Sequence, residues 1–100
     1  VFLTNIPRRK VEGLKMDYPS LSKLNPKLIY AWVSAFGPEG PDRDLSGFDY
    51  HGQGRSGMMF SMGEMGMPPL LAQFGVVDQA TAVMASHQIL IAHSCGSVLA

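Results

Sequence analysis

Apolar residues are concentrated in a few short runs, and each run predicts one element of secondary structure. Residues 1–4 are mostly apolar and lead into a turn, so we expect a short strand there. A nearly continuous apolar run over residues 27–36 predicts a second strand, covered on both faces. Between them, Tyr18–Leu24 has Pro19 in its first turn and two leucines on one face, which predicts a short helix.

The second half of the chain predicts loops and two helices. Residues 37–41 contain two glycines and two prolines, which exclude regular structure. Residues 48–59 predict a helix, and residues 63–69 predict a loop. The last helix is expected to begin at Asp78 and to be buried within protein, because no charged side chain follows that residue.

The order of these elements indicates the fold class. Strands that alternate with short helices predict an α/β layer with parallel strands. A chain of 100 residues holds at most one domain of ordinary size. It begins inside a predicted strand and stops inside an apolar helical pattern without a cap signal. We therefore expect residues 1–100 to be part of a domain in a longer chain.

Composition argues against several classes of function. The formal net charge is 0, so there is no basic excess to neutralise the phosphates of a nucleic acid. Residues 79–100 lack charged groups, but a polar group on nearly every turn favours a helix buried in protein over a membrane span. Cys95 is the single cysteine, which suits a reducing compartment such as the cytoplasm, and we expect a buried, inert thiol.

A glycine motif is present in the wrong context. Gly52, Gly54 and Gly57 have the G-x-G-x-x-G spacing that binds dinucleotides when it follows an apolar strand. Residues 46–51 are not such a strand. We interpret the motif as accidental, and a nucleotide-binding module is the last of the alternatives.

The histidines do not indicate a metal site. His87 and His93 are six residues apart, on different faces of a helix, so we expect no metal pair. His51 lies near a predicted helix start, where a structural hydrogen bond is the expected role.

Five of the seven methionines lie between Met58 and Met67. Flexible methionines fill gaps beside a core or a partner subunit, and they also form adaptable walls around apolar ligands. The sequence leaves both interpretations open, the second with an apolar acyl group as the ligand.

Asp78 is the strongest candidate for chemistry, and it has two interpretations. As an N-cap, it would accept hydrogen bonds from the free N–H groups of the last helix. As a nucleophile, its carboxylate would be kept ionised and oriented by the same helix end. Beside Val76 and Val77, in an apolar pocket, such an anion would lose part of its hydration and become reactive.

Several short stretches carry a resemblance to one enzyme family. They are Thr4-Asn5-Ile6-Pro7-Arg8, Asn25-Pro26-Lys27-Leu28-Ile29-Tyr30, Phe36-Gly37-Pro38-Glu39-Gly40-Pro41, Gly47-Phe48-Asp49, Met62-Gly63-Glu64-Met65-Gly66-Met67-Pro68-Pro69 and Val77-Asp78. Together they resemble the family III CoA-transferases, which include formyl-CoA transferase, carnitine CoA-transferase and alpha-methylacyl-CoA racemase. The similarity is clearest from Lys23 to Phe60.

The resemblance implies a fold and a reaction. The segment would belong to a Rossmann-like large domain of an interlocked homodimer, and by itself it would be inactive. Asp78 would attack an acyl-CoA thioester to form a mixed anhydride and then an aspartyl-CoA thioester, before a carboxylic acid accepts the CoA. Coenzyme A would be a substrate, with no tightly bound cofactor and no metal.

The resemblance also assigns the contacts to CoA. Asn5 and Ile6 would line the CoA corner. Ile6 replaces an aromatic residue of the family, and residues 7–9 are Pro-Arg-Arg where the family has Arg-Pro-Gly. Phe48 would pack beside the thioester. Racemases of the family have a catalytic histidine at that position, and phenylalanine cannot exchange a proton, which argues against racemisation.

Two further functions remain open at this point. One is a CoA-ester racemase or isomerase that uses Asp78 as a proton-transfer base. The other is a non-catalytic relative that only binds CoA or assembles with a partner, which the scrambled corner at residues 7–9 favours.

Overall fold

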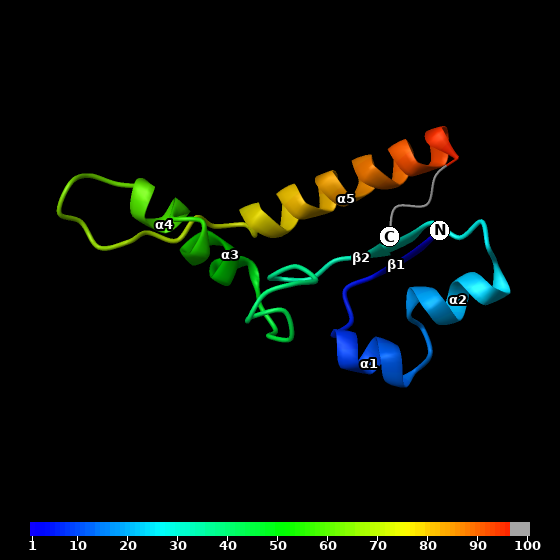
Figure 1. Cartoon of the computed structure of the whole chain (residues 1–100). Coiled ribbons are helices and arrows are strands. Elements are labelled where there is room, and N and C mark those ends of the chain that lie inside the picture. The colour runs from blue at the N-terminus through cyan, green and yellow to red at the C-terminus, as the bar shows by residue number, and fades with distance from the viewer. Residues whose placement is uncertain (97–100) are drawn as a thin grey trace.

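The computed structural model describes residues 1–96, in which a small parallel sheet is flanked by helices (Figure 1). The strands are β1 (Phe2–Thr4) and β2 (Tyr30–Trp32). They run parallel, with Phe2 opposite Tyr30 and Thr4 opposite Trp32. The prediction of an α/β fold with parallel strands is therefore confirmed.

Helices make up most of the regular structure in the described residues. In chain order they are α1 (Arg8–Gly13), α2 (Tyr18–Leu24), α3 (Asp49–Arg55), α4 (Met58–Ser61) and α5 (Val76–Cys95). In Figure 1, α1 and α2 lie on one side of the strands and α5 on the other, while α3 and α4 extend beyond the sheet. The predicted helix over Tyr18–Leu24 is confirmed. Asp17 caps it by accepting a hydrogen bond from the backbone N of Ser20 at 2.9 Å.

The second strand is shorter than the apolar run that predicted it. Only three residues pair, because β1 offers only three partners and a strand needs a hydrogen-bonded neighbour. After Trp32 and Val33 the chain turns, and the side chain of Ser34 accepts a hydrogen bond from the backbone N of Gly37 at 3.1 Å. Val33 is only half-buried. A strand within residues 27–36 is therefore confirmed, but the prediction of its length and of its covering on both faces is wrong for the described chain.

The helix predicted over residues 48–59 is divided in two. Gly57 has φ +76°, a left-handed conformation that ends α3 and precedes α4. The last helix begins at Val76, two residues earlier than predicted, because Gly75 takes the N-cap position with φ +62°.

The described chain buries few side chains. Those that are buried are Thr4, Val11, Tyr30, Gln53 and Ala92. Phe2 of β1 stacks on its strand partner Tyr30 of β2 with 5.4 Å between ring centroids. Within residues 1–96, helix α5 contacts α3 at Gly52 and lines a hollow together with β2, and most of its residues are exposed, including Cys95. Residues 1–96 by themselves leave this helix and its thiol exposed, so burial of both by the rest of a larger fold and a partner stays a prediction.

The chain is elongated, with extents of 55 × 30 × 21 Å and a radius of gyration of 16.4 Å. A compact domain of this length has a radius of gyration of about 13 Å.

None of the helices within residues 1–96 is long and apolar enough to cross a membrane.

Candidate active site

Asp78, the predicted nucleophile, lies in the first turn of α5 with an exposed side chain. It is the third residue of the helix and not its N-cap, which corrects the structural interpretation drawn from the sequence. A carboxylate in this turn lies near the positive end of the helix dipole. Two hollows, one between β2 and α5 and one beside α1 and α2, are lined by other residues. The described residues therefore do not enclose Asp78 in the apolar pocket that we expected.

The N–H groups at the start of α5 are bound by a residue of another helix. Asp49 is the first residue of α3, and its Oδ1 accepts hydrogen bonds from the backbone N of Val77 at 2.7 Å and of Asp78 at 2.9 Å. The pKa of the Asp49 carboxyl is lowered chiefly by the N–H of Asp78, with smaller contributions from Gln53 and Val77, while burial opposes the shift. Asp49 is therefore ionised at neutral pH and caps α5 from outside.

Gln53 is fully buried and links Asp49 to the segment before α5. Its Nε2 donates hydrogen bonds to Oδ2 of Asp49 and to the carbonyl oxygen of Ala72, the latter at 3.0 Å. Its Oε1 accepts one from the backbone N of Ala72 at 2.8 Å. Because donor and acceptor bind the same residue, the orientation of the amide is fixed.

A glycine allows α3 and α5 to approach closely. A Cβ at Gly52 would lie 2.7 Å from Cγ1 of Val77, closer than such atoms can stay without a shift. Gly52 and Gly54 lie within α3, and no strand precedes them in the described residues 33–48. The structure thus agrees that the glycine motif is no dinucleotide fingerprint, because Gly52 packs against a helix.

The sequence does not by itself identify Asp49, Gly52 and Gln53 as a group. Gly52 and Gln53 follow Asp49 by three and four residues, which places the three on one face of a helix. This spacing is the signal in the sequence that could have identified the group. The segment that this face contacts begins almost twenty residues later, so no local pattern indicates it.

Phe48 lies directly before α3, and its side chain is 67% exposed. Its ring stacks on Tyr50 with 5.8 Å between centroids, and its backbone N donates a hydrogen bond to Nδ1 of His51 at 3.0 Å. This bond confirms the structural role expected of His51. Phe48 is the residue before Asp49, whose Oδ1 accepts the hydrogen bond from the backbone N of Asp78. Within residues 1–96, no group of three or more His, Cys, Asp or Glu side chains is arranged to hold a metal ion.

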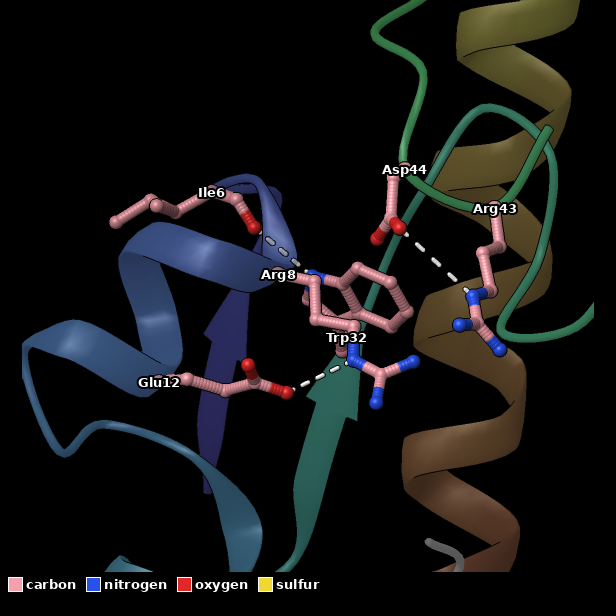
Figure 2. A network of polar contacts seen from close by, with 6 residues as sticks. All are labelled: Ile6, Arg8, Glu12, Trp32, Arg43 and Asp44. Atoms are coloured by element: carbon pink, nitrogen blue, oxygen red, sulfur yellow. Dashed lines mark hydrogen bonds and ion pairs between the residues drawn. The ribbon is translucent and has the colours of Figure 1, made fainter.

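Asn5 and Ile6 directly follow β1 in the chain. Figure 2 shows Ile6 beside Trp32. The backbone N of Ile6 donates a hydrogen bond to Oγ1 of the buried Thr4 at 3.1 Å, and its carbonyl oxygen accepts one from Nε1 of Trp32 at 2.9 Å. Asn5 is exposed. The corner after β1 is therefore tied to β2, and its contacts differ from those that hold the start of α5.

The sequence matches one protein family over nearly its whole length. The model of CoA-transferase family III matches residues 1–94. The chain belongs to CoA-transferase family III. The succinate–glutarate CoA-transferase of Agrobacterium fabrum is 41% identical to this family III chain, over 83% of the chain and 21% of that protein. An acyl-CoA transferase of Fusarium pseudograminearum is 35% identical over 92% of this chain and 20% of that protein. The chain thus spans about a fifth of the length of these curated relatives.

Solved structures agree with membership of CoA-transferase family III. A CaiB/BaiF family protein from Brucella suis superimposes on 97% of this chain with a TM-score of 0.79 at 25% identity, over 27% of its own length. A hypothetical protein from Mycobacterium tuberculosis superimposes on 90% of this chain with a TM-score of 0.80 at 29% identity, over 26% of its length. The described elements therefore match part of a larger known architecture.

Proposed function

We propose that this chain is an internal segment of the Rossmann-like large domain of a family III CoA-transferase, with Asp78 as its nucleophile. The complete enzyme, an interlocked homodimer, moves CoA from an acyl-CoA thioester to a free carboxylic acid. Family membership over residues 1–94 carries this proposal. The relative named as a succinate–glutarate CoA-transferase supports transfer between two acids.

In the proposed reaction every bond change occurs at a carbonyl carbon. A carboxylate oxygen of Asp78 attacks the thioester, the new C–O bond replaces the C–S bond, and CoA leaves as a thiolate. The thiolate then attacks the Asp78 carbonyl of the mixed anhydride, which releases the first acid as a carboxylate and forms an aspartyl-CoA thioester. The acceptor carboxylate and the thiolate repeat these two steps in turn, which releases the new acyl-CoA and restores Asp78.

The position of Asp78 supports this role. Its carboxylate is in the first turn of a helix, near the positive end of the helix dipole. The side chain is exposed in this chain, so a substrate can reach it. The remaining four fifths of such an enzyme and its partner subunit would supply the walls that exclude water from the intermediates.

The CoA corner and Phe48 have different parts in the proposal. The backbone N–H and C=O of Ile6 are already bound by Thr4 and Trp32, so Ile6 offers CoA its side chain, while the exposed Asn5 offers an amide. Phe48 packs beside the thioester. It has no exchangeable proton, which favours transfer over racemisation.

The test is substitution of Asp78 in the complete enzyme. Asp78→Asn keeps the shape of the side chain and removes the nucleophilic oxygen anion, so CoA transfer is expected to be abolished. Asp44→Asn is the matched control, because it removes an exposed carboxylate that forms an ion pair with its neighbour Arg43 at 3.8 Å. It is expected to leave the rate unchanged.

Mass spectrometry of the enzyme during turnover provides a second measurement. The aspartyl-CoA adduct is expected on the peptide that contains Asp78 in the wild type and in Asp44→Asn, and to be missing in Asp78→Asn. Transfer at the wild-type rate in Asp78→Asn would overturn the proposal. Exchange of the substrate α-hydrogen with deuterated water, without an acceptor acid, would favour the racemase alternative instead.

A further inference from the structure

We infer that Asp49 is a positioning residue for Asp78 and acts through the backbone of α5. The inference rests on the proposed role of Asp78 as the nucleophile. Its basis is that one oxygen of Asp49 accepts hydrogen bonds from the N–H groups of both Val77 and Asp78. The residue that would react is thus held directly at its own backbone, by a side chain that need not touch the substrate.

Asp49 is itself held in place by a buried group. Gln53 lies one helical turn further along α3 and donates a hydrogen bond to the other carboxylate oxygen of Asp49. The same amide binds both polar backbone atoms of Ala72. The contacts therefore run from Ala72 through Gln53 and Asp49 to Asp78, and they fix both ends of the segment that enters α5.

The backbone inside this segment explains why it needs such contacts. Phe74 has φ +71° and Gly75 has φ +62°, two successive left-handed residues. The left-handed conformation is unfavourable for phenylalanine, and such residues persist where the surrounding structure holds them. Asp49 and Gln53 hold the segment after and before these two residues, so loss of Asp49 would let the start of α5 relax.

A relaxed helix start would act on the chemical step. Attack requires the carboxylate oxygen and the thioester carbon to approach to about 3–3.5 Å with the correct alignment, and an error of about 1 Å can cost about a hundredfold in rate. CoA would be bound chiefly by the corner at Asn5 and Ile6, which has a different set of contacts. Loss of Asp49 is therefore expected to lower kcat and to leave the KM for acyl-CoA nearly unchanged.

The chain offers a matched control for this experiment. Asp17 caps α2 with the same chemistry, its Oδ1 accepting from the backbone N of Ser20 at 2.9 Å and its Oδ2 from the Ser20 hydroxyl at 2.9 Å. Asp49→Ala and Asp17→Ala each remove one carboxylate cap from one helix start. Both are expected to lower the melting temperature of the complete enzyme, and only Asp49→Ala is expected to lower kcat, by about a hundredfold.

Asp49→Asn is the conservative variant, and it also covers the case that Asp49→Ala does not fold. Asparagine keeps one oxygen that can accept from Val77 and Asp78, but its amide faces the donor Nε2 of Gln53. Its kcat is expected to lie between those of the wild type and Asp49→Ala. Recovery of kcat in Asp49→Asn supports a positioning role, because the oxygen is kept while the charge is lost.

The outcomes separate this inference from the function on which it rests. If the kcat of both Asp49 variants matches that of Asp17→Ala while Asp78→Asn is inactive, the positioning role is overturned and the nucleophile stands. A rise in KM with unchanged kcat in Asp49→Asn also overturns it. If Asp78→Asn transfers CoA at the wild-type rate, the proposed function fails and the positioning role fails with it.

Discussion

Three aspartates stand at helix starts in this chain, and they differ in what their carboxylates bind. Asp17 caps its own helix, and Asp49 caps a different helix. Asp78 lies in the first turn of the helix that Asp49 caps, with its side chain exposed. A carboxylate that already accepts several N–H groups has few lone pairs left for a substrate. Among the three, Asp78 therefore best fits the nucleophile that we propose.

The acid sensitivity of the enzyme is expected to depend on Asp49. Its pKa is lowered below the ordinary value of 3.8, so its contribution to stability is fully present above that value and is lost as the pH falls through the folded pKa. Between about pH 6 and about pH 2, the wild type should therefore lose more stability than Asp49→Asn. Denaturant unfolding of the complete enzyme at each pH measures this difference. Curves that run parallel over the whole range would contradict the prediction.

At the level of the elements, the contact between α3 and α5 decides where Asp78 lies. One face of α3 provides a carboxylate, a glycine and a buried amide, and each contacts the segment that leads into α5. The polar contacts fix the direction in which the chain enters α5. The glycine allows the short distance between α3 and α5. The short strands have a different place: β2 and the middle of α5 line a hollow, and Trp32 of β2 binds the carbonyl oxygen of Ile6 after β1.

Two glycines in α3 provide a test of this packing. Gly52→Ala places a methyl group 2.7 Å from Val77, whose branched side chain has little room to rotate, so we expect a loss of about 1–3 kcal/mol in the free energy of unfolding. Gly54→Ala in the same helix meets only Sδ of Met59 at 3.7 Å and should gain up to about 1 kcal/mol. Chemical denaturation of the complete enzyme measures both variants. Equal stability of the two would show that α3 and α5 do not pack as closely as described.

For the whole molecule, the important feature is the apolar surface that the described residues leave uncovered. Leu24, Phe60 and Phe74 are exposed by 83%, 83% and 88%, and Met65 and Met67 are exposed as well. Large exposed apolar surfaces mark contacts with other protein segments or ligands. This surface supports the proposal of a segment within a larger domain.

The chain produced alone is therefore expected to bind a hydrophobic dye strongly and to lack CoA transfer. The dye reports exposed apolar surface, and the walls around Asp78 are not formed by the described residues. Fluorescence of ANS with the isolated chain is compared with that of the complete enzyme at equal mass. Equal fluorescence, or transfer by the isolated chain, would contradict the proposal that the segment functions only within a larger fold.

Much of the fold could be predicted, because some features depend on neighbouring residues. Tyr18–Leu24 forms a helix since Asp17 and Pro19 favour its start, and parallel pairing follows from the order of strands and helices. The lengths of elements were less predictable. β2 stops where β1 offers no more partners, and the helix expected over residues 48–59 breaks at the left-handed Gly57.

The sequence by itself determined the family, the parallel α/β pattern and the position of Asp78 near the start of the last helix, since these are recorded in local motifs and spacing. Only the tertiary structure decided that Asp49, and not Asp78, caps that helix. The physical reason is that an N–H group can be satisfied by any acceptor that the fold brings within reach. Here the acceptor comes from α3, far from α5 in the sequence, because Gly52 and Gln53 hold the two segments together.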